Sequence, residues 1–174
     1  MERSIDGAIG EGWSGVDPDG CHVNVMLAER AGVTAASLLT AFASPAPGHT
    51  PILVCVGEDK DHYEPVWPPT VMVNKATTRT SRHEAVTFGA GQLGIGQGTL
   101  DAVADGLLEP TGDTLVFVAV WIDVGAGDET AVRQAARTAT RRAIGMAVEG
   151  RDPDAARALV ERRDELRNPY YGGR

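Results

Sequence analysis

Residues 114–123, T-L-V-F-V-A-V-W-I-D, form the clearest strand pattern in the chain. Valine and aromatic residues dominate this run, and β-branched and aromatic side chains favour extended structure. A second strand is predicted over 22–27, where Val, Val and Leu alternate with His, Asn and Met. Both patterns fit strands of one sheet, and this sheet sets the fold class.

The segment before the second strand predicts a β-hairpin. Residues 5–15 are glycine-rich and are expected to form a bent strand, and residues 17–20, Asp-Pro-Asp-Gly, are a strong turn signal. The hairpin then carries His22 and Asn24 on the same face of its second strand, about 7 Å apart.

The remaining pattern alternates helices with short strands. Helices are expected over 34–43, over 81–108 as one long helix or two, over 129–148 and over 153–167. Between the first two, we expect a short buried strand over 51–56, a polar loop over 57–69 and a strand over 70–77. This order predicts an α+β fold, a two-layer sandwich with one mainly antiparallel sheet backed by helices. The 174 residues are expected to form a single domain.

Composition excludes several classes of function. The formal net charge is −8 and the pI is near 4.9, which argues against a nucleic-acid partner. The basic cluster at 133–142 is interpreted as a solvated helix face. No disulfide framework is expected from Cys21 and Cys55, and no apolar run approaches the ~20 residues that span a bilayer. With no signal-peptide pattern at the N-terminus, a cytoplasmic location is expected.

Most catalytic motifs are missing from the sequence. Residues 89–94, Gly-Ala-Gly-Gln-Leu-Gly, match G-x-G-x-x-G, but a helix rather than a strand is predicted before them, which disfavours a dinucleotide site. We interpret these glycines as small residues that allow a helix or ligand to approach closely. There is no Walker loop, no G-x-S-x-G elbow and no histidine or cysteine pair at metal-ligand spacing, so no metal is expected.

A few polar residues on apolar segments remain as candidates for a site. His22 shares a strand face with Asn24, Lys75 and Thr77 are predicted on one face of the strand 70–77, and Gln92 begins the glycine-rich helix. Taken singly, each has an ordinary structural explanation, because a strand histidine often makes a structural hydrogen bond and a lysine at a strand end is often simply solvated.

In order along the chain, these pieces resemble the formaldehyde-activating enzymes. The resemblance covers roughly residues 5–150, with 151–174 as a helical extension, and is most specific in T-V-M-V-N-K-A-T at 70–77, in G-H-T-P at 48–51 and in the strand histidine. Further matching stretches are I-G-E-G at 9–12 and A-V-T-F-G-A-G-Q at 85–92.

The resemblance implies both fold and function. Members of that family condense formaldehyde with tetrahydromethanopterin, a hydro-lyase type reaction of one-carbon metabolism and formaldehyde detoxification, and need no metal. By this resemblance His22 is the catalytic acid, while Leu53, Lys75, Thr77 and Gln92 bind the reduced pterin, with Asn24 beside them. The family fold resembles domain 2 of ribosomal protein S5, and its members form homopentamers with the pterin site between subunits.

Histidine suits this chemistry. The pterin amine adds to formaldehyde to give a carbinolamine, and loss of its oxygen is slow unless an acid protonates it. An imidazole with an unperturbed pKa near 6.5 can give and regain a proton near neutral pH. No redox cofactor is required.

Two hypotheses follow, because this chain departs from the family at several points. The family has an aspartate where this chain has Asn24, which removes a negative charge that would favour the imidazolium of His22. The loop 57–69 is longer than the family's usual connection, and 121–124 replaces a segment bearing a His and a Trp. The chain is therefore either an enzyme that condenses formaldehyde with a reduced pterin, or a non-catalytic sensor or carrier that binds a carbonyl compound or a pterin.

Overall fold

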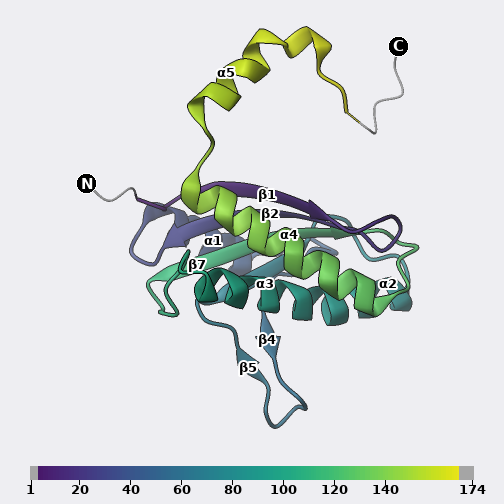
Figure 1. Cartoon of the computed structure of the whole chain (residues 1–174). Coiled ribbons are helices and arrows are strands. Elements are labelled where there is room, and N and C mark those ends of the chain that lie inside the picture. The colour runs from purple at the N-terminus through teal and green to yellow at the C-terminus, as the bar shows by residue number, and fades with distance from the viewer. Residues whose placement is uncertain (1–3, 169–174) are drawn as a thin grey trace.

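The computed structural model describes residues 4–168 as an α+β fold in which one five-stranded sheet is backed by two long helices. The strand order is β1-β2-β7-β6-β3, and every neighbouring pair is antiparallel except β6 and β7, which are parallel. The prediction of one mainly antiparallel sheet backed by helices is confirmed (Figure 1). The strands are β1 (Ile9–Ser14), β2 (Cys21–Glu29), β3 (Ile52–Leu53), β6 (Thr70–Asn74) and β7 (Thr114–Ile122).

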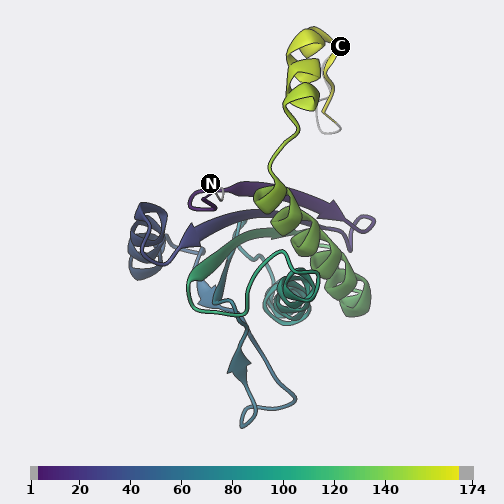
Figure 2. The ribbon, with the colours of Figure 1, turned by 60° about the vertical axis from the view of Figure 1, so that its left-hand side comes forward.

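The two long helices cover one face of the sheet. They are α3 (Gln92–Ala104) and α4 (Glu129–Glu149), which pack against each other, with α4 lying against β1 and β2 (Figure 2). In β2 the odd-numbered residues of Cys21–Leu27 are buried, whereas His22, Asn24 and Met26 alternate with them on the opposite face. The predicted alternation is therefore confirmed, and the candidate site lies on the face that these helices leave open.

Glycines bring α4 close to its neighbours. A Cβ added to Gly10 or Gly12 of β1 would lie about 2 Å from a backbone oxygen of α4, and one added to Gly94 would lie 2.3 Å from the carbonyl oxygen of Arg133. The interpretation of the glycine-rich segment as a close-packing surface is confirmed at Gly94.

The helix predicted over 81–108 is continuous but contains a wide turn. It consists of α2 (Ser81–Ala85), a π-helical turn (Val86–Gly91) and α3. Since α2 and not a strand leads into the glycines, the segment is no dinucleotide fingerprint. π-Helical turns inside α-helices are frequent at functional sites.

Three predicted elements are corrected. The strand predicted over 51–56 divides at the buried Val54, because Ile52–Leu53 pairs with β6 while β4 (Cys55–Val56) leaves the sheet to pair with β5 (Glu64–Pro65). The predicted loop 57–69 is thus part of a second hairpin that projects from the body of the protein (Figure 1). The strand predicted over 70–77 ends at Asn74, so Thr77 does not lie on it.

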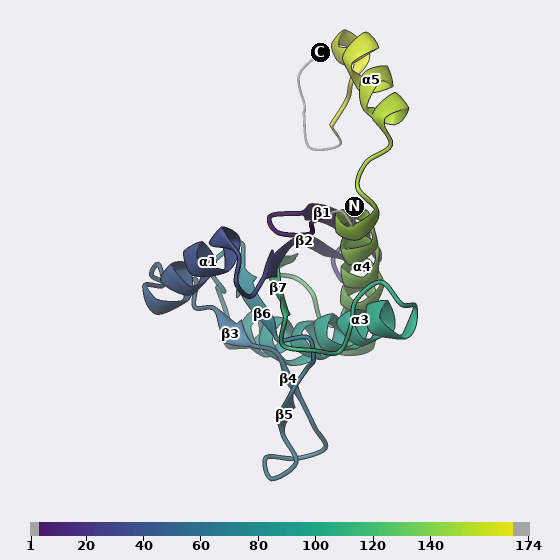
Figure 3. The same cartoon turned by 90° about the vertical axis from the view of Figure 1, so that its left-hand side faces the viewer.

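The C-terminal helix stands apart from the sheet. It comprises α5 (Pro153–Glu161) and a 3-10 turn (Arg163–Glu165), and none of its residues is buried. Figures 1 and 3 show it extending away from the end of α4. Of the helical extension expected over 151–174, residues 169–174 lie outside the described residues.

The basic cluster at 133–142, which the sequence suggested is a solvated helix face, forms ion pairs and a hydrogen bond with α3. Arg137 and Arg141 form ion pairs with Asp101 and Asp105, and Arg133 donates a hydrogen bond to Gln97. These contacts join α3 and α4, and the side chains that make them remain partly exposed.

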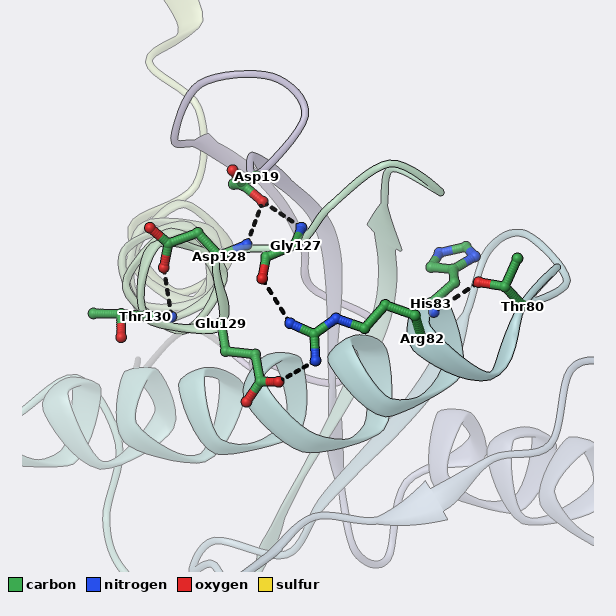
Figure 4. Close-up of polar contacts among 8 residues, drawn as sticks. All are labelled: Asp19, Thr80, Arg82, His83, Gly127, Asp128, Glu129 and Thr130. Carbon is green, nitrogen blue, oxygen red and sulfur yellow. Dashed lines mark hydrogen bonds and ion pairs between the residues drawn. The ribbon is translucent and has the colours of Figure 1, made fainter.

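A carboxylate from the turn at 17–20 holds the start of α4 in place. Asp19 accepts hydrogen bonds from the backbone N–H groups of Gly127 and Asp128, while the Asp128 side chain caps the helix by accepting from Thr130 (Figure 4). The two backbone hydrogen bonds lower the pKa of Asp19. The turn at 17–20 is thereby attached to α4.

Replacing Asp19 with alanine is expected to destabilise the protein at neutral pH but not in acid. A carboxyl whose pKa is lower in the folded than in the unfolded protein stabilises the folded state at pH values above its unfolded pKa of about 3.9. This stabilisation is lost as the pH falls through the pKa of the folded state. Thermal unfolding of wild type and Asp19→Ala from about pH 7 to about pH 2 should therefore show a gap that closes below about pH 4. Asp17→Ala, from the same turn, serves as control; a gap independent of pH would contradict this role of Asp19.

Candidate active site

Three of the predicted site residues meet on the open face of the sheet. Lys75, which follows β6, places its Nζ 2.9 Å from Nδ1 of His22 and 2.7 Å from Oδ1 of Asn24, both on β2. β7 lies between the two strands, so the lysine reaches across it to β2. The contact between distant segments brings a histidine, a lysine and an amide into one cluster.

A carboxylate completes the cluster on its other side. Oε1 of Glu11, on β1, lies 2.9 Å from Nε2 of His22. Both ring nitrogens of His22 are thus engaged, one by a carboxylate and one by an amine. The His22 side chain keeps 31% of its surface exposed, so the ring remains accessible to a ligand.

Two tryptophans border the histidine. The strand register places Trp13 of β1 and Trp121 of β7 directly opposite His22 on either side. The Trp13 and Trp121 rings stack at 5.8 Å between centroids, and the Trp13 ring lies 5.7 Å from the imidazole. This aromatic pair limits the directions from which a substrate can reach His22.

Burial sets the protonation tendencies around the lysine. Removal from water lowers the pKa of Lys75, because the charged ammonium is the form that burial disfavours. Burial raises the pKa of the nearby Cys21 thiol to about 12, so that thiol is neutral near pH 7. The lysine has a neutral thiol and a neutral amide for neighbours, and the charge of the Glu11 carboxylate, which is bound to the imidazole, offsets part of the effect of burial on the pKa of Lys75.

The loop that follows Lys75 is held by a buried amide. The Asn74 side chain donates hydrogen bonds to the carbonyl oxygens of Gly48 and Ala76, and its own backbone oxygen bonds to Nδ1 of His49. A Cβ added to Gly48 would lie 2.8 Å from Oγ1 of Thr77. The G-H-T-P loop and Thr77 are thus packed together beside the cluster, with Thr77 exposed.

The other two predicted pterin-binding residues lie elsewhere. Leu53 of β3 is paired with Val71 and faces an apolar pocket of about 260 Å³ between the open sheet face and α1 (Val33–Ala43). Gln92 begins α3, on the helix-covered side of the sheet, and is buried. Its amide accepts hydrogen bonds from Cys55 N–H and Tyr63 O–H, so it braces the projecting hairpin. One chain therefore does not bring Gln92 to His22.

Sequence reasoning missed Glu11 and both tryptophans. The alternation of residues 9–14 places Glu11 and Trp13 on one face of β1, which was an available signal once the hairpin was predicted. Trp121 lies at the end of the clearest strand, and only the pairing of β7 with β2 brings it to the histidine.

The described residues contain neither a metal-binding cluster nor a membrane-spanning helix. Within residues 4–168, no group of three or more His, Cys, Asp or Glu side chains is placed to hold a metal ion. No helix in that range has both the length and the apolar character needed to cross a membrane.

Comparison with known proteins gives a consistent picture. The family model described as formaldehyde-activating enzyme matches residues 9–171, which extends past the boundary of about 150 expected from sequence. The chain is 32% identical to 5,6,7,8-tetrahydromethanopterin hydro-lyase of Methanosarcina barkeri, over 98% of this chain and 93% of that protein.

Longer relatives match over part of their length. The bifunctional enzyme Fae/Hps of Methanothrix thermoacetophila is 27% identical over 95% of this chain, and the enzyme of that name from Methanococcoides burtonii is 28% identical over 88%. The chain spans 41% and 38% of these two proteins. The family match covers nearly the whole chain, and the chain belongs to the formaldehyde-activating enzyme family.

Proposed function

We propose that this protein is a lyase that condenses formaldehyde with tetrahydromethanopterin or a related reduced pterin, with His22 as the general acid. The observation that carries the proposal is the accessible imidazole of His22, held at both ring nitrogens between Glu11 and Lys75. Family membership and the name of the Methanosarcina barkeri relative give the reaction class.

The geometry suits an acid that must be protonated again after each turnover. Glu11 lies against Nε2 and is itself about half exposed, so the ring is held in one orientation beside a group that solvent can reach. The His22 side chain is partly exposed on the open face of the sheet, where a substrate could approach it. A positioned acid of this kind typically accelerates a reaction by about 10²–10⁴-fold.

A second subunit is part of the proposal. The open face of the sheet carries a row of partly exposed apolar side chains, and only Ala35 of α1 is buried. Gln92 lies on the other side of the sheet from His22, so a pterin that contacts both would need them from two different copies. Both observations support an assembly in which the pterin binds between neighbours, as in the homopentamer expected by resemblance; light scattering measures the number of copies.

By resemblance to the family we further propose a fold like domain 2 of ribosomal protein S5 and pterin contacts from Leu53, Lys75, Thr77 and Gln92. From the sequence itself we propose one domain, with a core of about 5–150 and a helical extension, and a cytoplasmic location. Asn24 is assigned to the same site through its hydrogen bond with Lys75.

The experiment that tests the reaction compares rates with and without protein. Purified protein is mixed with formaldehyde and tetrahydromethanopterin, then with tetrahydrofolate, and the methylene product is followed against the spontaneous rate. A rate clearly above the background supports the enzyme. A rate equal to the background, together with binding of the pterin in a calorimeter, would instead support the sensor or carrier, the function that Asn24 favours.

A further inference from the structure

The contacts around His22 have the form of a nucleophile, a base and an orienting group. A nucleophile is recognised by a base within hydrogen-bond reach, which is in turn oriented by a third group. Here the amine of Lys75 lies 2.9 Å from Nδ1 of His22, whose Nε2 lies 2.9 Å from the Glu11 carboxylate. The three side chains come from β1, β2 and the end of β6 and form one line across the open face of the sheet.

Lys75 is free of the partner that would hold it as an ammonium ion. Among the described residues, it forms no ion pair with a carboxylate, and its second contact is the neutral amide oxygen of Asn24. The Cys21 thiol near it is neutral near pH 7. Burial is the largest influence on the lysine and lowers the pKa of Lys75, although the charge of the Glu11 carboxylate, which is bound to His22, acts in the opposite direction.

We propose that Lys75 is a nucleophile that accepts formaldehyde as a covalent Schiff base, activated by His22, and passes the one-carbon unit to the amine carrier. This inference rests on the proposed function and deepens it, since it gives Lys75 a catalytic role in addition to contact with the pterin. Glu11 is a positioning residue, which acts through the imidazole.

The steps balance without a further reagent. His22 takes a proton from the Lys75 ammonium, and the amine lone pair attacks the carbonyl carbon. One proton then passes from the lysine nitrogen to the former carbonyl oxygen, which gives a carbinolamine. The imidazolium of His22 then protonates the hydroxyl, the C–O bond breaks and water leaves, so that an iminium, Lys–NH⁺=CH₂, remains. A carrier amine attacks the CH₂ carbon and its proton passes to the lysine nitrogen, so that the bond from carbon to Lys75 breaks and Lys75 leaves as a neutral amine. The second carrier nitrogen then attacks the carrier iminium that remains and loses a proton, which closes the methylene bridge and restores the Lys75 ammonium. One water is formed for each formaldehyde, and no electrons are exchanged.

Asn24 has a defined part in this arrangement. Its amide oxygen accepts a hydrogen bond from Nζ at 2.7 Å and orients the amine without adding a negative charge. A carboxylate at the same place would stabilise the ammonium and leave fewer lysines able to attack. The Asn24→Asp variant is therefore expected to slow adduct formation at Lys75.

The sequence supplies an internal control, because the chain contains only two lysines, Lys60 and Lys75. Lys60 is exposed, on the projecting hairpin. Purified protein is treated with limiting formaldehyde and cyanoborohydride, which reduces a Schiff base to N-methyl-lysine, and each lysine is followed by peptide mass mapping. We expect Lys75 to be methylated at least about tenfold faster than Lys60, and His22→Gln to remove this advantage.

Two rate measurements complete the test. Lys75→Arg keeps the positive charge but cannot lose its proton, so the rate of product formation should fall by about 10²-fold or more. Asn24→Asp should lower that rate if Lys75 is the nucleophile, and should raise it if His22 acts alone as an acid. Equal methylation of the two lysines in wild type, or a Lys75→Arg enzyme that keeps its rate, would overturn the inference.

The outcomes separate this inference from the proposed function. Rapid formation of methylene-tetrahydromethanopterin without preferential methylation of Lys75 leaves the reaction in place and removes the covalent step. Preferential methylation of Lys75 without product above the spontaneous rate keeps the nucleophile and removes the pterin as its acceptor.

Discussion

Replacing His22 with alanine is expected to slow methylene product formation by about 10²–10⁴-fold relative to wild type, down toward the spontaneous rate. The variant loses the acid that protonates the departing oxygen, and it leaves Glu11 and Lys75 without the ring that joins them. Some acceleration should remain, because holding the reactants side by side does not depend on the imidazole. The measurement is the initial rate of methylene-pterin formation after subtraction of the uncatalysed reaction.

His62→Ala is the matched control for this experiment. His62 also lies beside a carboxylate, that of Asp59, but on the exposed tip of the projecting hairpin, where 75% of its side chain is exposed. Its replacement should leave the rate within about twofold of wild type, as is usual for surface substitutions. Equal rates for wild type and His22→Ala would show that His22 is not the acid, whatever the fold of the variant.

The parts of the fold that could be predicted from sequence are those in which a local pattern has one structural meaning. From Leu115 onward the run 114–123 alternates between partly buried and buried residues, and the observed strand ends within one residue of the predicted one. The same alternation placed His22 and Asn24 on one face of β2. Both results depend only on the two-residue period of a strand.

Pairing between distant segments could not be predicted in this way. Lys75 reaches His22 because β6 pairs with β7 in parallel and β7 pairs with β2, and neither register follows from local composition. The prediction of one strand over 51–56 was wrong for a related reason. Val54 is buried where the chain passes from one sheet to the other, so the apolar pattern continues although the strand does not. The resemblance grouped Gln92 with His22, whereas in one chain the sheet separates them.

Replacing Gly94 with alanine is expected to destabilise the protein by about 1–3 kcal/mol, the usual cost of an added methyl group that a packed core cannot accommodate. The new Cβ would lie 2.3 Å from the carbonyl oxygen of Arg133 and 2.7 Å from Cβ of Ala136, both on α4. The first contact is with helix backbone, which cannot rotate away as a side chain can, so α3 and α4 must separate. Urea unfolding of wild type and variant measures the change as a lower midpoint.

Gly89→Ala provides the same chemical change where there is room for it. Gly89 lies in the π-helical turn of the same continuous helix, and a Cβ added there meets no atom within 4 Å. Alanine favours helix over glycine by up to about 1 kcal/mol, so this variant should be as stable as wild type or more stable. The expected changes in the free energy of unfolding have opposite signs because only Gly94 contacts α4. The gain in helix propensity from glycine to alanine is the same at both sites. If Gly94→Ala also stabilised the protein, the close packing of α3 on α4 that buries the helical face of the sheet would be wrong.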